Sequence, residues 1–193
     1  MKTLFGLLFI LLSVNLSFGN DYNIQTRGTI IPESRKLLTG KLYDFFKSYD
    51  TAILRAIIKP VIYEGSKSGN SNVQYMVDKN RELIGILSEL HPVSYNPDEM
   101  NPNDEFIVLA GVIELYLEQK ANQQTNFANP AACIKNVIAG FLNIGSLIED
   151  YTALIRNGAS WSTVRNLIWR TVKRYSGWIA AAAIIYEIVT ECF

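Results

Sequence analysis

The chain contains a single histidine, His91, so a serine or cysteine nucleophile that needs a histidine base would have to use it. His91 precedes a proline in a segment that we expect to be a loop, and no serine stands in the G-x-S-x-G pattern of a nucleophile elbow. A zinc site needs more histidine and cysteine ligands than the chain holds. Neither G-x-G-x-x-G nor a phosphate-loop motif is present. We therefore expect no enzyme activity, no catalytic residue, no metal and no cofactor.

Two groups of carboxylates could do chemistry in another setting. Glu114 and Glu118 lie one helical turn apart, and a carboxylate pair performs acid–base catalysis in glycosidases. Such a pair more often marks the solvated face of a helix, which is what we expect here. Residues 96–105, NPDEMNPNDE, offer four acids that could bind calcium, but they lack the D-x-[DN]-x-[DN]-G spacing. Calcium is a minor alternative to helix capping by Asp104 and Glu105.

The two cysteines, Cys133 and Cys192, form an even pair. In an exported protein such a pair predicts one disulfide, because the compartments outside the cytoplasm are oxidising. The bond would close a loop of roughly 60 residues, which the chain-entropy model rates at about 4 kcal/mol. Two unpaired buried thiols are the alternative.

The first residues are typical of a secretory signal peptide. Lys2 supplies a positive charge, residues 4–12 are a short apolar run, and Ser17 and Gly19 are the small residues that signal peptidase requires. We expect residues 1–19 to be removed and the protein to be secreted or periplasmic. An uncleaved anchor is the alternative, although the run is shorter than the roughly 20 residues of a membrane span.

Charge is distributed unevenly along a chain whose formal net charge is +0 at pH 7. Residues 92–129 contain six acids and one base, Lys120. Residues 151–186 contain no acid and five bases, which are Arg156, Arg165, Arg170, Lys173 and Arg174. The overall balance predicts no nucleic-acid partner, while the C-terminal third is locally basic.

The hydrophobic periodicity is helical nearly throughout, and no alternating strand pattern extends beyond a few residues. We predict an all-α fold of about six helices, the first of them kinked or ended by Pro60. The predicted helices span residues 34–64, 73–90, 103–120, 130–156, 161–175 and the stretch after Gly177. We divide the chain after the signal peptide into an N-terminal helical region, 20–128, and a C-terminal helical module, 129–193, in which three helices are closed by the disulfide.

The predicted helix 161–175 is amphipathic and basic. Its apolar stripe consists of Trp161, Val164, Ile168, Val172 and Tyr175, and bases lie roughly opposite. Helices of this kind lie in membrane interfaces, where each base near an anionic surface contributes about 1 kcal/mol. The predicted contact residues for a membrane or partner are Trp161, Arg165, Trp169, Arg170, Lys173 and Arg174. In the alternative, the stripe packs on the core and the bases face water or pair with the acidic residues of 92–129.

An acidic leader ahead of a basic helical module resembles, in general layout, helical bacteriocins and saposin-like lytic proteins. The saposin pattern needs more cysteines than this chain has, and Lys120 is the only basic processing point in the linker. The terminal apolar run, residues 178–186, is too short to span a membrane, so a core helix pinned by Cys192 is expected.

Our leading functional hypothesis is an exported, non-enzymatic helical protein whose C-terminal module contacts an anionic membrane surface or a protein partner. Its sharpest form is a bacteriocin-like toxin. The competing hypothesis is a soluble single-domain helical binding or structural protein with no membrane activity. A carrier of a small ligand, lined by the chain's tyrosines and phenylalanines, is the third.

Overall fold

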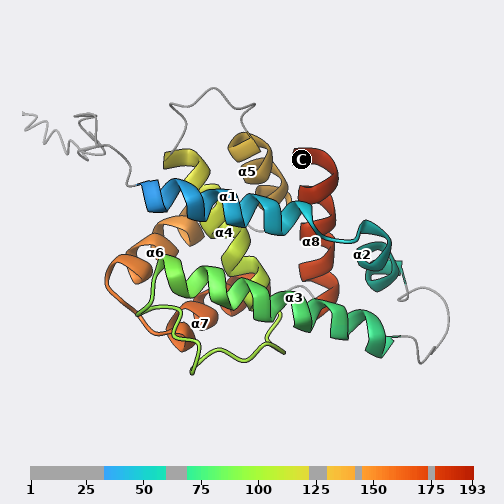
Figure 1. The fold of residues 1–193 in the computed structure, drawn as a ribbon, viewed down its shortest axis with the longest axis horizontal. Coiled ribbons are helices and arrows are strands. Elements are labelled where there is room, and N and C mark those ends of the chain that lie inside the picture. The colour runs from blue at the N-terminus through green and yellow to red at the C-terminus, as the bar shows by residue number, and fades with distance from the viewer. Residues whose placement is uncertain (1–32, 60–68, 122–129, 142–144, 174–176) are drawn as a thin grey trace, which may run out of the picture. The chain divides into compact units, whose positions relative to one another are not determined.

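The computed structural model describes residues 33–59, 69–121, 130–141, 145–173 and 177–193 (Figure 1). Every regular element in these ranges is a helix, which confirms the predicted all-α class. The helices are α1 (Glu33–Lys47), α2 (Thr51–Ile58), α3 (Gly69–Leu90), α4 (Phe106–Ala121), α5 (Pro130–Phe141), α6 (Gly145–Arg156), α7 (Trp161–Val172) and α8 (Gly177–Cys192). The predicted signal peptide, residues 1–19, lies outside the described residues.

The helix predicted for residues 34–64 is two helices, because a capping residue stands inside the apolar pattern. Asp50 has extended backbone angles, and its carboxylate accepts hydrogen bonds from the backbone N–H groups of Ala52 at 2.8 Å and Ile53 at 3.2 Å. An aspartate at this position satisfies two of the N–H groups that a helix start leaves without partners. The chain therefore turns between α1 and α2 well before Pro60, the predicted breakpoint.

The helix predicted for residues 130–156 is also two, α5 and α6, with residues 142–144 between them outside the described part of the chain. Helix α6 ends at Arg156, the predicted end of this segment, and Asn157-Gly158 follows it. Gly158 has a positive φ of 65°, and Ala159 N–H donates to the carbonyl of Leu154 at 3.0 Å. This is the Schellman arrangement, which favours glycine because other residues are strained at positive φ.

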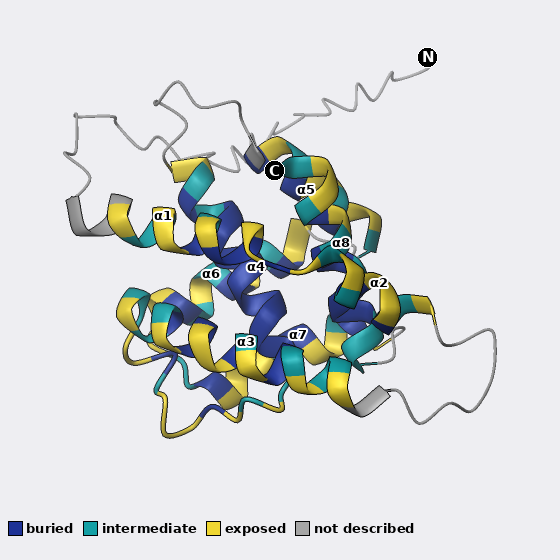
Figure 2. Ribbon diagram, turned by 45° about the vertical axis from the view of Figure 1, so that its right-hand side comes forward, coloured by how far each residue is buried: buried dark blue, intermediate teal, exposed yellow. Residues whose placement is uncertain are grey.

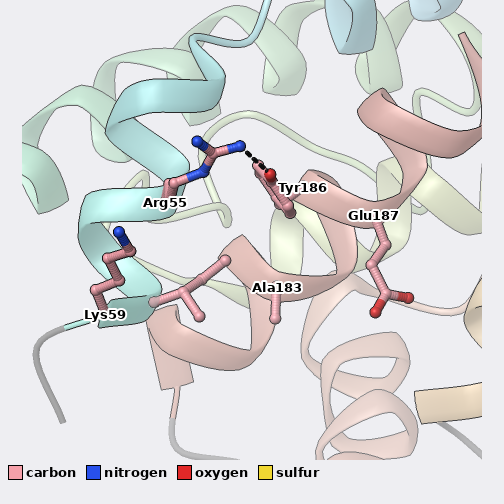
Figure 3. Close-up of a pocket in the computed structure, with 6 residues that line it drawn as sticks. Arg55, Lys59, Ala183, Tyr186 and Glu187 are labelled. Atoms are coloured by element: carbon pink, nitrogen blue, oxygen red, sulfur yellow. Dashed lines mark hydrogen bonds between the residues drawn. The ribbon is translucent and has the colours of Figure 1, made fainter. Parts of the chain in front are cut away.

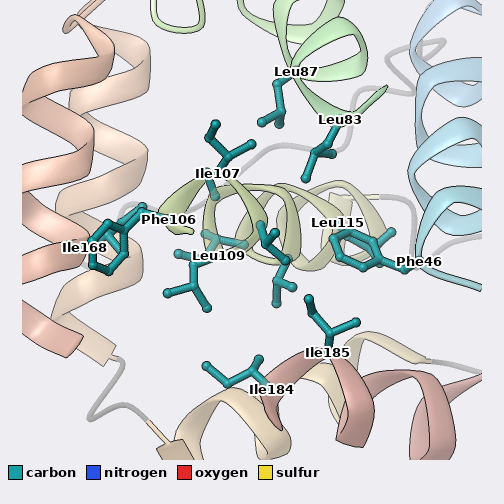
Figure 4. Packing of buried hydrophobic residues seen from close by; sticks show 14 of the residues in the cluster. Phe46, Leu83, Leu87, Phe106, Ile107, Leu109, Leu115, Ile168, Ile184 and Ile185 are labelled. Atoms are coloured by element: carbon teal, nitrogen blue, oxygen red, sulfur yellow. The ribbon is translucent and has the colours of Figure 1, made fainter. Parts of the chain in front are cut away.

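Helix α4 lies at the centre of the helical assembly and is buried on every side (Figure 2). It packs against α1, α3, α5, α7 and α8. A run such as FIVLAGVIELYL is apolar on all faces, and a helix of that kind must be surrounded by protein. The sequence predicted a solvated Glu114–Glu118 face on this segment, so the structure corrects that expectation. The side chains packed around α4 in Figure 4 include Phe46, Leu83, Leu87, Ile168, Ile184 and Ile185.

Helix α4 begins three residues later than the sequence predicts. The side chain of Asn101 accepts the backbone N–H of Asn103 at 3.0 Å in a turn that precedes the helix. Asp104 Oδ1 accepts the N–H of Phe106 at 3.1 Å and so caps α4. Buried Asn80 on α3 holds this start in place, since its side-chain amide donates to the carbonyl of Asp104 at 2.9 Å.

Helix α8 is a core helix, and its buried side carries Ala180, Ala181, Ala182, Ile184, Ile185 and Ile188. It packs against α2 and α5, and Cys192 near its end is bonded to Cys133 on α5, with an S–S distance of 1.98 Å and a Cα–Cα distance of 5.7 Å. This confirms the predicted disulfide. The bond is compatible with an extracellular or periplasmic location.

Residues 32–193 form one compact unit by their internal contacts. The helices of the predicted module 129–193 share a core with those of the N-terminal region, since α8 packs on α2 and α5 packs on α4. No single helix in the described ranges is long and apolar enough to cross a membrane. Helices α5 and α6, whose axes are bent by 111° from each other, are long and apolar enough only when they are taken together.

Candidate contact surface on helix α7

The apolar stripe of α7 faces the protein core. Trp161, Val164, Ile168 and Val172 are all buried, and the ring of Trp161 lies 6.1 Å from that of Tyr95. Trp161 is only 2% exposed, so this predicted contact residue is a core residue in the structure. The stripe covers the central helix, because α7 packs against α4. Tyr175, which we placed on the same stripe, lies outside the described residues.

Beside this stripe, α7 presents a tryptophan between basic residues. Trp169 is 46% exposed, which makes it one of the few large apolar side chains on the described surface. Arg170 and Lys173 are exposed, and Arg170 Nε donates to the carbonyl of Asn166 one turn earlier at 3.3 Å. We call Trp169, Arg170 and Lys173 the α7 edge. Arg174, the last predicted contact residue, lies outside the described residues.

Arg165 lies beside the α7 edge and forms an ion pair with Asp104. Its Nε is 2.5 Å from Oδ2 of Asp104, at the start of α4. The side chain of Arg165 is 48% exposed, whereas that of Asp104 is only 8% exposed. The guanidinium also lies over the ring of Phe106, 5.8 Å from its centroid. One predicted contact base therefore pairs with the acidic segment, as the alternative interpretation of the sequence expected.

Phe106 contacts both Arg165 and Trp169. Its ring, buried at 3% exposure, meets the indole of Trp169 edge to face with centroids 5.6 Å apart. Edge-to-face aromatic pairs contribute about 0.5–1.5 kcal/mol beyond the area that they bury. The first residue of α4 therefore orients Trp169, so this tryptophan is half-exposed and held in position rather than free to rotate.

Glu114 is the centre of a polar cluster that the sequence interpretation missed. It is 1% exposed, and its Oε1 accepts hydrogen bonds from the hydroxyls of Tyr95 at 2.8 Å and Tyr151 at 3.0 Å. His91 Nε2 lies 3.4 Å from the other carboxylate oxygen. Our expectation of a solvated Glu114–Glu118 face was wrong, since Glu118 is also buried, at 3% exposure. The apolar residues on all sides of Glu114 in the sequence were the available signal.

The two tyrosine hydroxyls of this cluster also contact each other. Burial raises the pKa of Tyr151 well above its usual value, because the phenolate form would lose its hydration. Buried polar groups are costly unless they have partners, and here one carboxylate provides partners for both hydroxyls. The cluster joins the loop after α3 to α4 and α6, so it holds together three parts of the fold.

A groove of about 350 Å³ lies between α2 and α8 (Figure 3). The residues that line it are Arg55, Ile58, Lys59, Ala183, Tyr186 and Glu187. Arg55 donates a hydrogen bond to the hydroxyl of Tyr186 and lies over its ring at 5.3 Å. Because this guanidinium already joins α2 to α8, we assign it to helix packing.

The structure adds no metal centre within the ranges that it describes, since no three histidine, cysteine, aspartate or glutamate side chains gather there in a suitable group. Of the predicted contact residues, it brings together Arg165, Trp169, Arg170 and Lys173 on one helix surface and places Trp161 in the core. No protein-family model, curated protein or solved structure matches this chain.

Proposed function

We propose that this chain is an exported, non-enzymatic helical protein that binds an anionic membrane surface through the α7 edge. The observation that carries the proposal is a half-exposed tryptophan, Trp169, next to the exposed bases Arg170 and Lys173. An indole can enter the headgroup region while neighbouring bases bind lipid phosphates. The contact is peripheral, because the apolar stripe is occupied by the core.

The non-enzymatic part of the proposal is supported by the surroundings of the reactive side chains. The single histidine, His91, faces the buried carboxylate of Glu114 and not a nucleophile. Both cysteines are joined in the disulfide and are not free thiols. The disulfide and the signal-like first 19 residues support export.

Binding to lipid vesicles tests the proposal. The purified protein is sedimented with phosphatidylcholine vesicles that contain or lack phosphatidylglycerol, at low and at high salt. We expect binding only to the anionic vesicles and release at high salt, because exposed charges are screened within about 10 Å at 0.1 M. In R170Q/K173Q the affinity should fall about thirtyfold, since two bases contribute about 1 kcal/mol each.

A matched control separates the α7 edge from overall charge. K47Q/K135Q removes two positive charges from exposed side chains on α1 and α5 and leaves α7 intact. It should bind as the wild-type protein does. Equal weakening by both double variants, or no binding of the wild-type protein to anionic vesicles at low salt, would contradict the proposal.

Two further measurements refine the proposal. Tryptophan emission should shift to the blue on binding to vesicles. W169F should remove that shift, because Trp161 is already buried and Trp178 lies on α8, outside the α7 edge. Release of a trapped dye would extend the proposal to a bacteriocin-like activity that permeabilises membranes. Binding without release would restrict the function to peripheral attachment.

The second candidate function is a soluble single-domain helical binding or structural protein with no membrane activity. It is favoured by the burial of the α7 stripe, since Val164 and Ile168 are 0% exposed. Limited trypsin digestion addresses it, because Lys120 is the last basic residue before the junction of the two predicted regions. Resistance at Lys120 together with absence of vesicle binding would favour this candidate. Cleavage there with release of residues 121–193 would contradict it.

A further inference from the structure

We infer that Asp104 is an internal competitor for the basic surface of α7: by occupying Arg165 it weakens the attachment of that surface to anionic lipid. This inference rests on the proposed function and names how the same surface is regulated. It is carried by the contact between Asp104 Oδ2 and Arg165 Nε, 2.5 Å, and by the position of Arg165 one helical turn from Trp169.

Asp104 is held where it can compete. Its Oδ1 caps α4 at Phe106 N–H, and its backbone carbonyl accepts the side-chain amide of Asn80. A carboxylate that is held by a cap bond, on a backbone that Asn80 holds, loses little freedom when it binds a guanidinium. The contact therefore costs less conformational entropy than a bond between two mobile surface side chains. Asp104 is therefore a preorganised partner for Arg165.

Lipid phosphate competes with this carboxylate for Arg165, whose Nε is engaged by Asp104. A guanidinium binds carboxylate and phosphate through the same set of N–H donors, so the two anions compete. Arg165 is still 48% exposed, so lipid can reach it from the solvent side. The intact protein then binds through Arg170 and Lys173 with Arg165 withheld, and loss of the Asp104 charge makes a third base available.

A double-mutant cycle of wild type, D104N, R165Q and D104N/R165Q tests the inference. D104N keeps an oxygen that can cap α4, because asparagine is as good a cap as aspartate, and it removes the charge that holds Arg165. We expect D104N to bind anionic vesicles about fivefold more tightly than wild type, the effect of one added base. In the R165Q background the D104N change should give no such gain, because there is no guanidinium to release.

D98N is the matched charge control. Asp98 is exposed in the same acidic segment, so D98N raises the net charge by the same amount without touching α7. Thermal unfolding followed by circular dichroism checks that each variant is folded. A gain in D104N that equals that of D98N, or that persists in full in the R165Q background, overturns the inference while the proposed function stands. If wild type and D104N both fail to bind, the proposed function fails and the inference with it.

Discussion

The hydroxyl of Tyr151 on α6 lies 3.0 Å from Oε1 of Glu114 on α4, and both side chains are shielded from solvent. A carboxylate at the centre of a helical core is stable only if hydrogen-bond donors replace its lost hydration. Tyr95 and Tyr151 supply two donors, and His91 lies at the second oxygen. Tyr151 therefore joins α6 to the central helix through a directional contact.

Y151F should lower the free energy of unfolding by about 1.5–3 kcal/mol, the range for a hydrogen bond to a charged group. The aromatic ring is retained, so the loss reports on the hydroxyl alone. Urea unfolding followed by circular dichroism measures it. Y43F is the control, because the Tyr43 ring packs edge to face on Phe193 without using its hydroxyl, and we expect a change within about 0.5 kcal/mol. Equal effects of the two variants would argue against the role of the cluster.

Alkaline pH should destabilise the protein in a defined direction. Burial raises the pKa of Tyr49 and of Tyr151 above the usual value of about 10. The folded state thus keeps both phenols neutral, and their contribution to stability is fully present below about pH 10. It is lost as the pH rises from there through the folded-state pKa values, because only the unfolded chain can release those protons. Phenolate absorbance and circular dichroism, recorded together, should show a late fraction of tyrosines that ionises only with unfolding. Complete ionisation in a folded protein would disprove this.

Removal of the disulfide should lower the free energy of unfolding by about 4 kcal/mol, the chain-entropy value for a loop of this length. C133A/C192A is compared with wild type by urea unfolding, with and without a reducing agent. Wild type should lose stability on reduction, whereas the variant should be indifferent to the reductant. A variant as stable as the oxidised protein would mean that the packing of α8 holds the tail without the bond.

Two glycine substitutions should change stability in opposite directions. A Cβ on Gly111 of α4 would lie 2.7 Å from Leu83 Cδ2 and 3.2 Å from Phe46 Cζ, and both neighbours are buried. G111A should therefore cost about 1–3 kcal/mol through overpacking. A Cβ on Gly85 of α3 meets nothing within 4 Å, so G85A should stabilise the helix by up to about 1 kcal/mol. Thermal unfolding of both variants measures these two changes in stability. A stabilised G111A would contradict the close approach of α3 and α4.

Collisional quenching should distinguish two of the tryptophans. Iodide in solution should reach Trp169, which is 46% exposed, and leave Trp161 unquenched at 2% exposure. W169F should consequently lose much of the quenchable emission, while W161F should retain it. Should W161F lose the quenchable fraction instead, α7 would be turned the other way from the arrangement in this structure.

The all-helical class and the disulfide could be predicted because each depends on local or pairwise signals. Apolar spacing by three and four residues defines a helix, and two cysteines leave one possible pairing. The helix breaks were harder to predict. Asp50 interrupts an apolar pattern that continues on both sides of it, and only its hydrogen bonds to Ala52 and Ile53 reveal a cap.

The contact surface was only partly predictable for a different reason. Periodicity shows that Trp161 and Trp169 lie on different parts of α7, but it does not show which part meets the core. The position of α4 determines this, because α4 is apolar on all sides and the Trp161 stripe packs against it. The ion pair of Arg165 is likewise a tertiary contact, since its partner Asp104 lies 61 positions earlier in the chain.

The central position of α4 has a consequence for the order in which the chain emerges during synthesis or export. When residue 121 has just emerged, α4 can be covered only by α1 and α3 among the helices that it finally contacts. The surfaces that α5, α7 and α8 will cover are still exposed to water, and they are among the most apolar of the chain. A nascent chain halted at this point would present a long apolar helix to whatever chaperone or translocation machinery surrounds it, and the last 16-residue helix, α8, completes the enclosure.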